Sequence, residues 1–158
     1  MQDGGNVALF SHIMIGANDV GAMVAYYDRV LARVGLCRTT PLDDIGPAGV
    51  IWQKPQKRWL QFALRKPIND ESATAGNGVQ VSFQCGSRTA VDMAWKEALR
   101  GGGSDEGPPG DRPVYHEDFY AAYARDPEGN KICFLFCEEF AEGDSISNYH
   151  PFSPKLSP

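Results

Sequence analysis

The feature of this sequence that most constrains its fold is an internal repeat with an offset of 68 positions. Residues 10–35 align with residues 78–103, and each segment passes from a short strand-like run through a turn into an amphipathic helix that stops at glycine. Like residues therefore occupy equivalent positions in two copies of one structural unit. The aligned pairs include Tyr27 with Trp95, Leu31 with Leu99, and Gly35 with Gly103.

Each copy contains one predicted helix. Apolar residues recur at intervals of three and four over residues 20–34 and again over residues 91–99. Asn18 or Asp19 can cap the first helix and Ser87 the second, because their side chains can accept a hydrogen bond from the first free backbone N–H groups. Glycine follows both segments, which is typical of a helix end.

Three further strand candidates follow each helix, so the unit reads βαβββ and occurs twice. They span residues 36–40, 49–53 and 59–64 in the first copy, and residues 104–114, 119–125 and 131–137 in the second. A turn is predicted between the last two strands at Asp126-Pro-Glu-Gly-Asn130, because proline presets the turn dihedral and glycine accepts a positive φ.

These elements predict an α+β protein in which two βαβββ modules form a curled mixed sheet. We expect a single domain over residues 1–137, with module one at about 9–66 and module two at about 78–137. Residues 138–158 then form a C-terminal tail that carries several acidic residues and prolines.

In the first and last predicted strands of each module, two kinds of side chain alternate strictly along the chain. One parity is apolar throughout and is expected to pack against the two helices. The other parity mixes aromatic and polar residues, which is typical of a ligand-binding face, the alternative being a solvated sheet. The apolar set comprises Ile13, Ile15, Leu60, Phe62, Leu64, Val79, Val81, Phe83, Ile132, Phe134 and Phe136.

Composition restricts the partners. The chain has 15 basic and 20 acidic residues and a net charge of −5, so it lacks the positive surface that nucleic acid requires. No apolar run approaches the roughly 20 residues of a membrane helix, and no basic segment precedes an apolar stretch as in a signal peptide. None of the four cysteines lies in a C-x-x-C pair. We expect a cytoplasmic protein with reduced thiols and a small-molecule ligand, without nucleic-acid or membrane partners.

Four segments resemble the vicinal oxygen chelate superfamily, which includes glyoxalase I, extradiol dioxygenases and bleomycin-resistance proteins. They are residues 10–16 (FSHIMIG), 23–28 (MVAYYD), 79–83 (VQVSF) and 120–132 (YAAYARDPEGNKI), and the likeness covers about residues 8–138. The resemblance implies a half-barrel built from two βαβββ modules and a homodimer. It leaves the chemistry open, because this scaffold carries many activities and also pure binding proteins.

In this superfamily the metal ligands come from the first and last strand of each module. Matched by position, the ligands would be His12, Gln61, Gln80 and Cys133. Gln80 stands where the family commonly has histidine, and Cys133 where it commonly has glutamate. Without a carboxylate the set disfavours Mg²⁺, Mn²⁺ or Ni²⁺, so that any divalent metal would be Zn²⁺. The alternative is that all four are polar or semi-buried residues of the cavity.

A second cluster precedes the seventh strand. Tyr115 and His116, followed by Tyr120 and Tyr123, are similar to a pattern in uncharacterised bacterial members of the same superfamily. His116 would act beside the cavity as an acid, a base or a polar anchor, or it is a structural histidine bonded to the loop backbone. We place Tyr120 and Tyr123 on the same face of their strand. The candidate catalytic residues are thus His116, Cys133 and Tyr120, and the candidate substrate-binding residues are Phe10, Met14, Trp59 and Tyr123.

Three functions follow from this interpretation. The first is an enzyme of the glyoxalase and dioxygenase superfamily that acts on a small organic molecule, such as a metal-assisted lyase or isomerase with a degenerate metal site. The second is a non-catalytic binding or sequestering protein of the bleomycin-resistance type. The third is an interaction module whose acidic tail docks a partner. The missing carboxylates favour the second function, and the retained His12 and the Tyr-His cluster favour the first.

Overall fold

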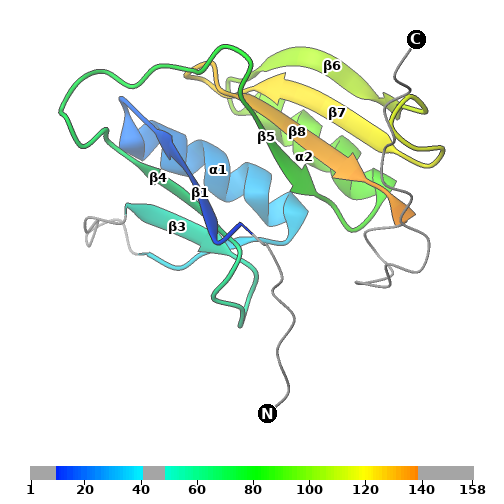
Figure 1. Ribbon diagram of the computed structural model, residues 1–158, viewed down its shortest axis with the longest axis horizontal. Helices are drawn as coiled ribbons and strands as arrows, with labels where there is room; N and C mark the ends of the chain where they lie inside the picture. Colours follow the sequence, from blue (N-terminus) through cyan, green and yellow to red (C-terminus); the bar gives the residue numbers. More distant parts are fainter. Residues whose placement is uncertain (1–9, 41–48, 139–158) are drawn as a thin grey trace, which may run out of the picture.

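The computed structural model describes residues 10–40 and 49–138 and confirms the repeated βαβββ order (Figure 1). The predicted tail, apart from Glu138, lies outside the described residues. The first module consists of β1 (His12–Gly16), α1 (Val20–Val34), β2 (Cys37–Arg38), β3 (Val50–Gln53) and β4 (Gln61–Arg65). The second consists of β5 (Gln80–Gln84), α2 (Arg88–Arg100), β6 (Ser104–Asp111), β7 (Tyr120–Arg125) and β8 (Lys131–Phe136).

Each module forms one four-stranded mixed sheet, and both sheets have the same topology. The strand orders are β1-β4-β3-β2 and β5-β8-β7-β6. The first and last strands of a module are parallel neighbours, and the other pairs are antiparallel. The two sheets do not close into a barrel, which agrees with the predicted open, curled arrangement (Figure 1).

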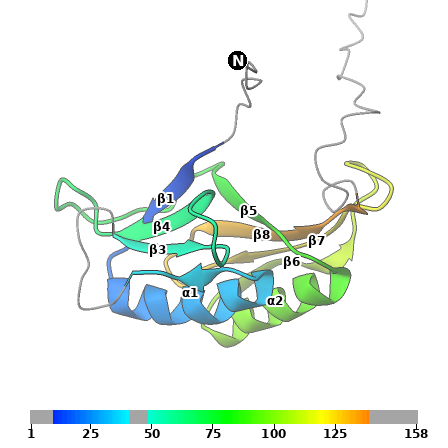
Figure 2. The ribbon, with the colours of Figure 1, turned by 90° about the horizontal axis from the view of Figure 1, so that it is seen from below.

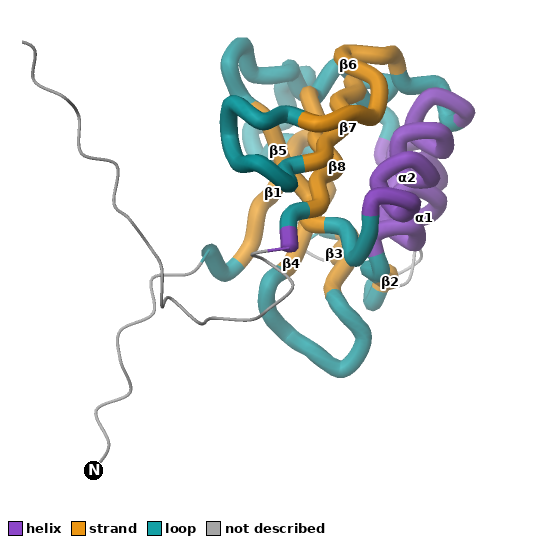
Figure 3. Tube along the Cα trace, turned by 90° about the vertical axis from the view of Figure 1, so that its right-hand side faces the viewer, coloured by secondary structure: helices purple, strands orange, loops and turns teal. Residues whose placement is uncertain are grey.

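The two helices lie together on one side of both sheets and leave the opposite sheet faces open (Figures 2 and 3). Asp19 caps α1 by accepting a hydrogen bond from the Ala22 N–H at 2.9 Å, and Ser87 caps α2 through the Ala90 N–H at 3.1 Å. Gly35 ends α1 with a φ of 86°, a left-handed conformation that glycine adopts without steric cost. The predicted caps and the glycine stop of α1 are therefore confirmed.

A chain of aromatic rings runs through the core from one module to the other. Tyr27 of α1 lies 4.8 Å from Phe62 of β4, measured between ring centroids. Phe62 meets Phe83 of β5 edge-on at 5.3 Å, and Phe83 stacks on Phe134 of β8 at 6.3 Å. All four side chains belong to one buried cluster. The modules consequently share a continuous hydrophobic core.

The predicted turn between β7 and β8 joins the modules through hydrogen bonds. Asp126 is only 3% exposed and accepts a hydrogen bond from the Tyr27 hydroxyl at 2.7 Å. It also accepts from the backbone N–H groups of Glu128 and Asn130 and from the Asn130 side chain. Glu128 in turn accepts from the backbone N–H groups of Asn18 and Asp19 at the start of α1. The turn of the second module thus holds α1 of the first module in place.

The predicted apolar parity is confirmed in the middle of the strands but not at their ends. Phe62, Leu64, Val81, Ile132 and Phe134 are buried, as expected. Ile13, Leu60 and Val79, however, are 39%, 54% and 59% exposed. Leu60 and Val79 precede the first paired residues of β4 and β5, and Ile13 lies near the start of β1. Within the described residues, no helix is long and apolar enough to span a bilayer.

Two neighbouring tyrosines of α1 give a matched test of the turn that joins the modules. Tyr27→Phe removes the hydroxyl that donates to buried Asp126, so we expect the free energy of unfolding to fall by about 1–2 kcal/mol. Tyr26→Phe removes a buried hydroxyl that has no hydrogen-bond partner among the described residues, and its effect should stay below about 0.5 kcal/mol. Urea denaturation measures both, and equal losses in the two variants would contradict the role of the Tyr27–Asp126 bond.

Candidate functional site

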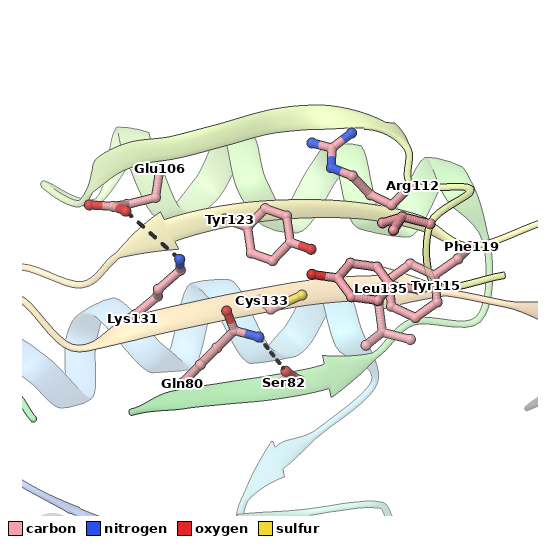
Figure 4. Close-up of a pocket in the computed structure, with 11 residues that line it drawn as sticks. Gln80, Ser82, Glu106, Arg112, Tyr115, Phe119, Tyr123, Lys131, Cys133 and Leu135 are labelled. Atoms are coloured by element: carbon pink, nitrogen blue, oxygen red, sulfur yellow. Dashed lines mark hydrogen bonds and ion pairs between the residues drawn. The ribbon is translucent and has the colours of Figure 1, made fainter. Parts of the chain in front are cut away.

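A cavity of about 500 Å³ lies on the open face of the second sheet, on the side away from α2 (Figure 4). Strand alternation creates this face, because Gln80 and Ser82 of β5 are exposed whereas the intervening Val81 and the following Phe83 pack into the core. β5, β7 and β8 supply the floor, and the segment after β6 supplies one end. The lining residues are Gln80, Ser82, Glu106, Arg112, Val114, Tyr115, Phe119, Tyr123, Lys131, Cys133 and Leu135.

Two cations and an aromatic ring meet in this cavity. The Arg112 guanidinium lies 5.6 Å and the Lys131 ammonium 5.4 Å from the centroid of the Tyr123 ring. Arg112 donates hydrogen bonds to the carbonyl oxygens of Pro108 and Asp111, and these carbonyls carry no net charge. The positive charge of Arg112 is therefore not neutralised by these contacts.

Glu106 is the one carboxylate among the residues that line this cavity, and it is already engaged. Arg125 donates to its Oε1 at 2.6 Å, and the Lys131 ammonium lies 4.0 Å from its Oε2. The strong pair with Arg125 offsets the charge of Glu106. Arg112 and Lys131 consequently give the cavity a positive character, although the whole chain has a net charge of −5.

Cys133 lies at the floor of the cavity as a neutral thiol. Its side chain is 1% exposed, and Tyr123 is its partner in the β7–β8 register. Burial raises the pKa of the Cys133 thiol to about 11, although a hydrogen bond with Ser82 and the nearby charge of Lys131 act in the opposite direction. A thiol with this pKa is almost entirely protonated at neutral pH, so it is a weak nucleophile.

The four predicted metal positions fall into two pairs of strands. His12 is the register partner of Gln61 in the first sheet, whereas in the second sheet Gln80 is paired with Lys131 and Cys133 with Ser82. Gln80 and Cys133 line the 500 Å³ cavity, and His12 and Gln61 do not. His12 contacts the Ser11 hydroxyl, and Gln61 donates to the Gln53 side chain at 2.9 Å.

The chemistry of these four residues does not fit a hard divalent cation. One histidine, two neutral amides and a thiol include no carboxylate, which is the ligand type that hard cations prefer. A role for this set in metal binding stays a prediction.

Tyr120 and Tyr123 lie on opposite faces of β7, and the expectation that they share a face is wrong. Residues three apart on a strand point to opposite sides of the sheet. The Tyr120 hydroxyl donates to Asp92 of α2 at 2.9 Å, and its ring lies under Arg88, so it faces the helix. Tyr123 lines the cavity. Of the two, only Tyr123 is therefore placed to touch a ligand there.

The remaining predicted binding residues lie in the first module. Met14 borders a different cavity, of about 580 Å³, formed with the loop that follows β4. Phe10 and Trp59 are 80% and 53% exposed and line neither of these two cavities. Their part in ligand binding stays a prediction.

His116 lies in the segment before β7, in contact with Asp118 and with Cys137, which follows β8. The Cys137 thiol donates to Asp118 Oδ1 at 3.1 Å, and the Glu138 backbone N–H donates to Asp118 Oδ2 at 2.7 Å. These two hydrogen bonds, the thiol first, lower the pKa of Asp118 to about 2, so this carboxylate is ionised at neutral pH. His116 thus contacts two side chains in this cluster, and its role as an acid, a base, a polar anchor or a structural histidine stays a prediction.

Sequence reasoning missed two charged residues of the cavity. Glu106 lies in β6, and Arg112 is the residue that follows this strand. β-bulges interrupt the pairing of β6 with β7. A period-two pattern cannot be followed through such a segment, which also contains two prolines and two glycines. Lys131, by contrast, lies on the predicted polar parity and could have been named from that pattern alone.

Comparison with known proteins gives a consistent result. The family model described as glyoxalase/bleomycin resistance protein/dioxygenase superfamily matches residues 9–134. A crystal structure of a glyoxalase/bleomycin resistance protein from Albidiferax ferrireducens is 33% identical, with a TM-score of 0.72, and the match covers 81% of this chain and 98% of that one. No curated protein matches the chain.

Two more distant structures share the fold. A glyoxalase-related enzyme from Fulvimarina pelagi is 17% identical, with a TM-score of 0.62, over 84% of this chain and 90% of that one. A lactoylglutathione lyase from Agrobacterium tumefaciens is 20% identical, with a TM-score of 0.56, over 85% of this chain and 98% of that one. At these identities the likeness concerns the fold alone.

Proposed function

The chain belongs to the glyoxalase/bleomycin resistance protein/dioxygenase superfamily, and from this premise we propose that it binds a small planar organic anion in the cavity of the second sheet. The observation that carries the proposal is the pairing of Arg112 with the Tyr123 ring inside a cavity of about 500 Å³. This volume is within the range of small-molecule sites. The function is binding or sequestration.

The chemistry of the lining residues supports an anionic ligand. An arginine held by neutral carbonyl groups keeps donors in a planar fork that matches a carboxylate. Lys131 adds a second positive charge from β8. Gln80 and Ser82, which are hydrogen-bonded to each other at 3.0 Å, supply neutral polar groups at the opposite wall (Figure 4).

A planar ligand is supported by the aromatic side chains at the end of the cavity that the segment after β6 supplies. Tyr115 and Phe119 pack against each other with ring centroids 5.2 Å apart, and both line the cavity together with Tyr123. Rings arranged in this way offer flat apolar surfaces on which a conjugated or aromatic molecule can stack. Apolar walls with a few charged groups are the usual composition of such sites.

Binding is favoured over catalysis because the cavity lacks an available base. Glu106 is paired with Arg125, and the Cys133 thiol is protonated at neutral pH. Burial also raises the pKa of Tyr123. Glu106 is thus engaged by a cation, and the raised pKa values keep the Cys133 thiol and the Tyr123 hydroxyl protonated at neutral pH, so none of the three is ready to abstract a proton.

A variant of the cavity arginine tests this proposal. Arg112→Gln should weaken the binding of aromatic carboxylates, such as hydroxybenzoates, by about 10- to 100-fold, because a charge-assisted hydrogen bond is lost. The matched control is Arg58→Gln, which removes the same charge from an exposed arginine beside Trp59 in the first module. Isothermal titration with the acids and with their neutral amides measures the effect. Equal affinity for acids and amides would overturn the proposal.

The second candidate is a metal-assisted lyase or isomerase that uses His12, Gln61, Gln80 and Cys133. One observation favours it: His12 and Gln61 are directly opposed on adjacent parallel strands, in the arrangement that the family resemblance predicts. Its weakness is the lack of a carboxylate described above.

Elemental analysis of tag-free protein tests the second candidate. If the strand residues hold a metal, we expect a stoichiometric amount in the wild type that disappears in His12→Ala, because the variant removes the only imidazole of the set. Equal metal content in the variant and the wild type, including none in either, would contradict this candidate.

A homodimer remains a proposal from the superfamily resemblance, and exposed apolar residues give it a surface. Phe10 and Leu60 are 80% and 54% exposed, and they lie near each other because the Gln61 N–H donates to the carbonyl of Ser11.

A cytoplasmic location likewise remains a proposal, which fractionation of the source cells tests.

Light scattering on the purified protein measures the oligomeric state. We expect a dimer, and Leu60→Asp should shift it toward monomer because a buried charge opposes association. Gln56→Asp, in the exposed segment before β4, is the control. A wild-type protein that is monomeric at all concentrations would contradict the expectation.

A further inference from the structure

We propose that His116, Asp118 and Cys137 form a zinc-binding site that ties the segment before β7 to the end of β8. One potential ligand atom from each residue lies within 4.8 Å of the other two. This site is separate from the four strand positions discussed above and shares no residue with them. It lies where the loop that precedes β7 passes the tip of β8 (Figure 1).

Two of the three distances between the ligand atoms are close to the spacing that a metal ion requires. Cys137 Sγ lies 3.8 Å from His116 Nδ1 and 3.1 Å from Asp118 Oδ1, and His116 Nδ1 also contacts this oxygen closely. Ligands of a tetrahedral zinc ion lie about 3.3–3.6 Å apart, given Zn–N and Zn–S bonds of about 2.0–2.3 Å. To admit the ion, His116 Nδ1 and Asp118 Oδ1 would move apart, because these two atoms are closer than two ligands of one zinc ion.

The hydrogen bonds in the cluster show why a cation fits between these atoms. The thiol of Cys137 and Nδ1 of His116 both converge on one carboxylate oxygen, Oδ1 of Asp118. Without a metal, protons hold such a cluster together. A zinc ion would take their place, since metal binding requires a thiolate and an imidazole nitrogen that has lost its proton.

The same geometry argues against a Cys-His-Asp catalytic triad. In such a triad the two ring nitrogens have separate tasks, because one contacts the nucleophile and the other the carboxylate. Here both contacts are made by His116 Nδ1. The Cys137 thiol is also only 2% exposed, so it is poorly placed to attack a substrate.

The donor set suits zinc better than the hard cations. A thiolate, an imidazole and a carboxylate are the three ligand types that zinc accepts in proteins, and together they carry two negative charges. The backbone N–H of Glu138 holds the second oxygen of Asp118 and so orients Oδ1 toward the other two ligands. Water can occupy the fourth position from the side of His116, whose side chain is 45% exposed.

Metal at this site would also fix one wall of the cavity. Tyr115 and Phe119 flank the cluster in sequence and line the cavity. The segment between them is closed by hydrogen bonds from the Phe119 N–H to the His116 carbonyl and from the Arg112 N–H to the Phe119 carbonyl. Anchoring His116 and Asp118 to Cys137 would hold these two rings in place.

A cobalt titration followed by absorbance tests the proposal. Co²⁺ takes the place of Zn²⁺ in such sites, and a cysteine ligand gives a thiolate-to-metal charge-transfer band in the near ultraviolet. We expect a band that saturates at one equivalent of Co²⁺ and is displaced by Zn²⁺. His116→Gln and Cys137→Ser should abolish it, and zinc should raise the Tm of the wild type but not of these variants.

Matched variants outside the cluster separate this site from the strand positions. Cys133→Ser and His12→Gln should keep the cobalt band, because their side chains belong to the other proposed set. Loss of the band in Cys133→Ser with retention in Cys137→Ser would overturn the proposal, as would binding only at a large molar excess of metal.

A second measurement covers the case in which the Cys137 variant does not fold. In the wild type, at a urea concentration that lets buried thiols react, zinc should slow the alkylation of Cys137 more than that of Cys85, which is similarly buried and lies outside the cluster, as mass spectrometry of the digested protein can show. Equal alkylation of Cys137 with and without zinc would also overturn the proposal.

Discussion

The hydrogen bonds of the buried Asp126 side chain are the interactions on which the packing of the two modules depends. A charge that is 3% exposed is stable only when its oxygens receive hydrogen bonds, and Asp126 receives four. Three of them come from its own turn and shape the β7–β8 hairpin. The fourth comes from Tyr27 in the helix of the other module. One side chain therefore sets a local turn and the contact between two modules that lie far apart in sequence.

The hairpin that Asp126 shapes also determines the two candidate sites. Its register places Tyr123 opposite Cys133 at the floor of the cavity. It also places Tyr120 opposite Phe136, at the end of the hairpin that is farthest from the turn. Continued two residues beyond that pair, the same register brings Asp118 beside Glu138, and their hydrogen bond of 2.7 Å confirms it. The contacts of His116 with Asp118 and Cys137 are thus a consequence of where the turn begins.

Much of the fold could be predicted because it is encoded locally and encoded twice. The repeat, the cap residues Asp19 and Ser87, and the Asp126–Asn130 turn each depend on a few neighbouring residues. The alternation of β5 and β8 likewise identified the face that carries Gln80 and Cys133. Burial at the strand ends could not be predicted in the same way, because it depends on how far each helix reaches across its sheet.

The candidate sites were less predictable, for two physical reasons. Tyr120 was assigned to the wrong face although the period of a strand, applied strictly, separates it from Tyr123. Arg112 comes from a bulged, proline-rich segment in which no period holds. The charge of the cavity depends on such residues. Over distances beyond about 8 Å salt screens the net charge of −5, so Arg112 and Lys131 set the local charge, and an acidic protein can carry a positively charged cavity.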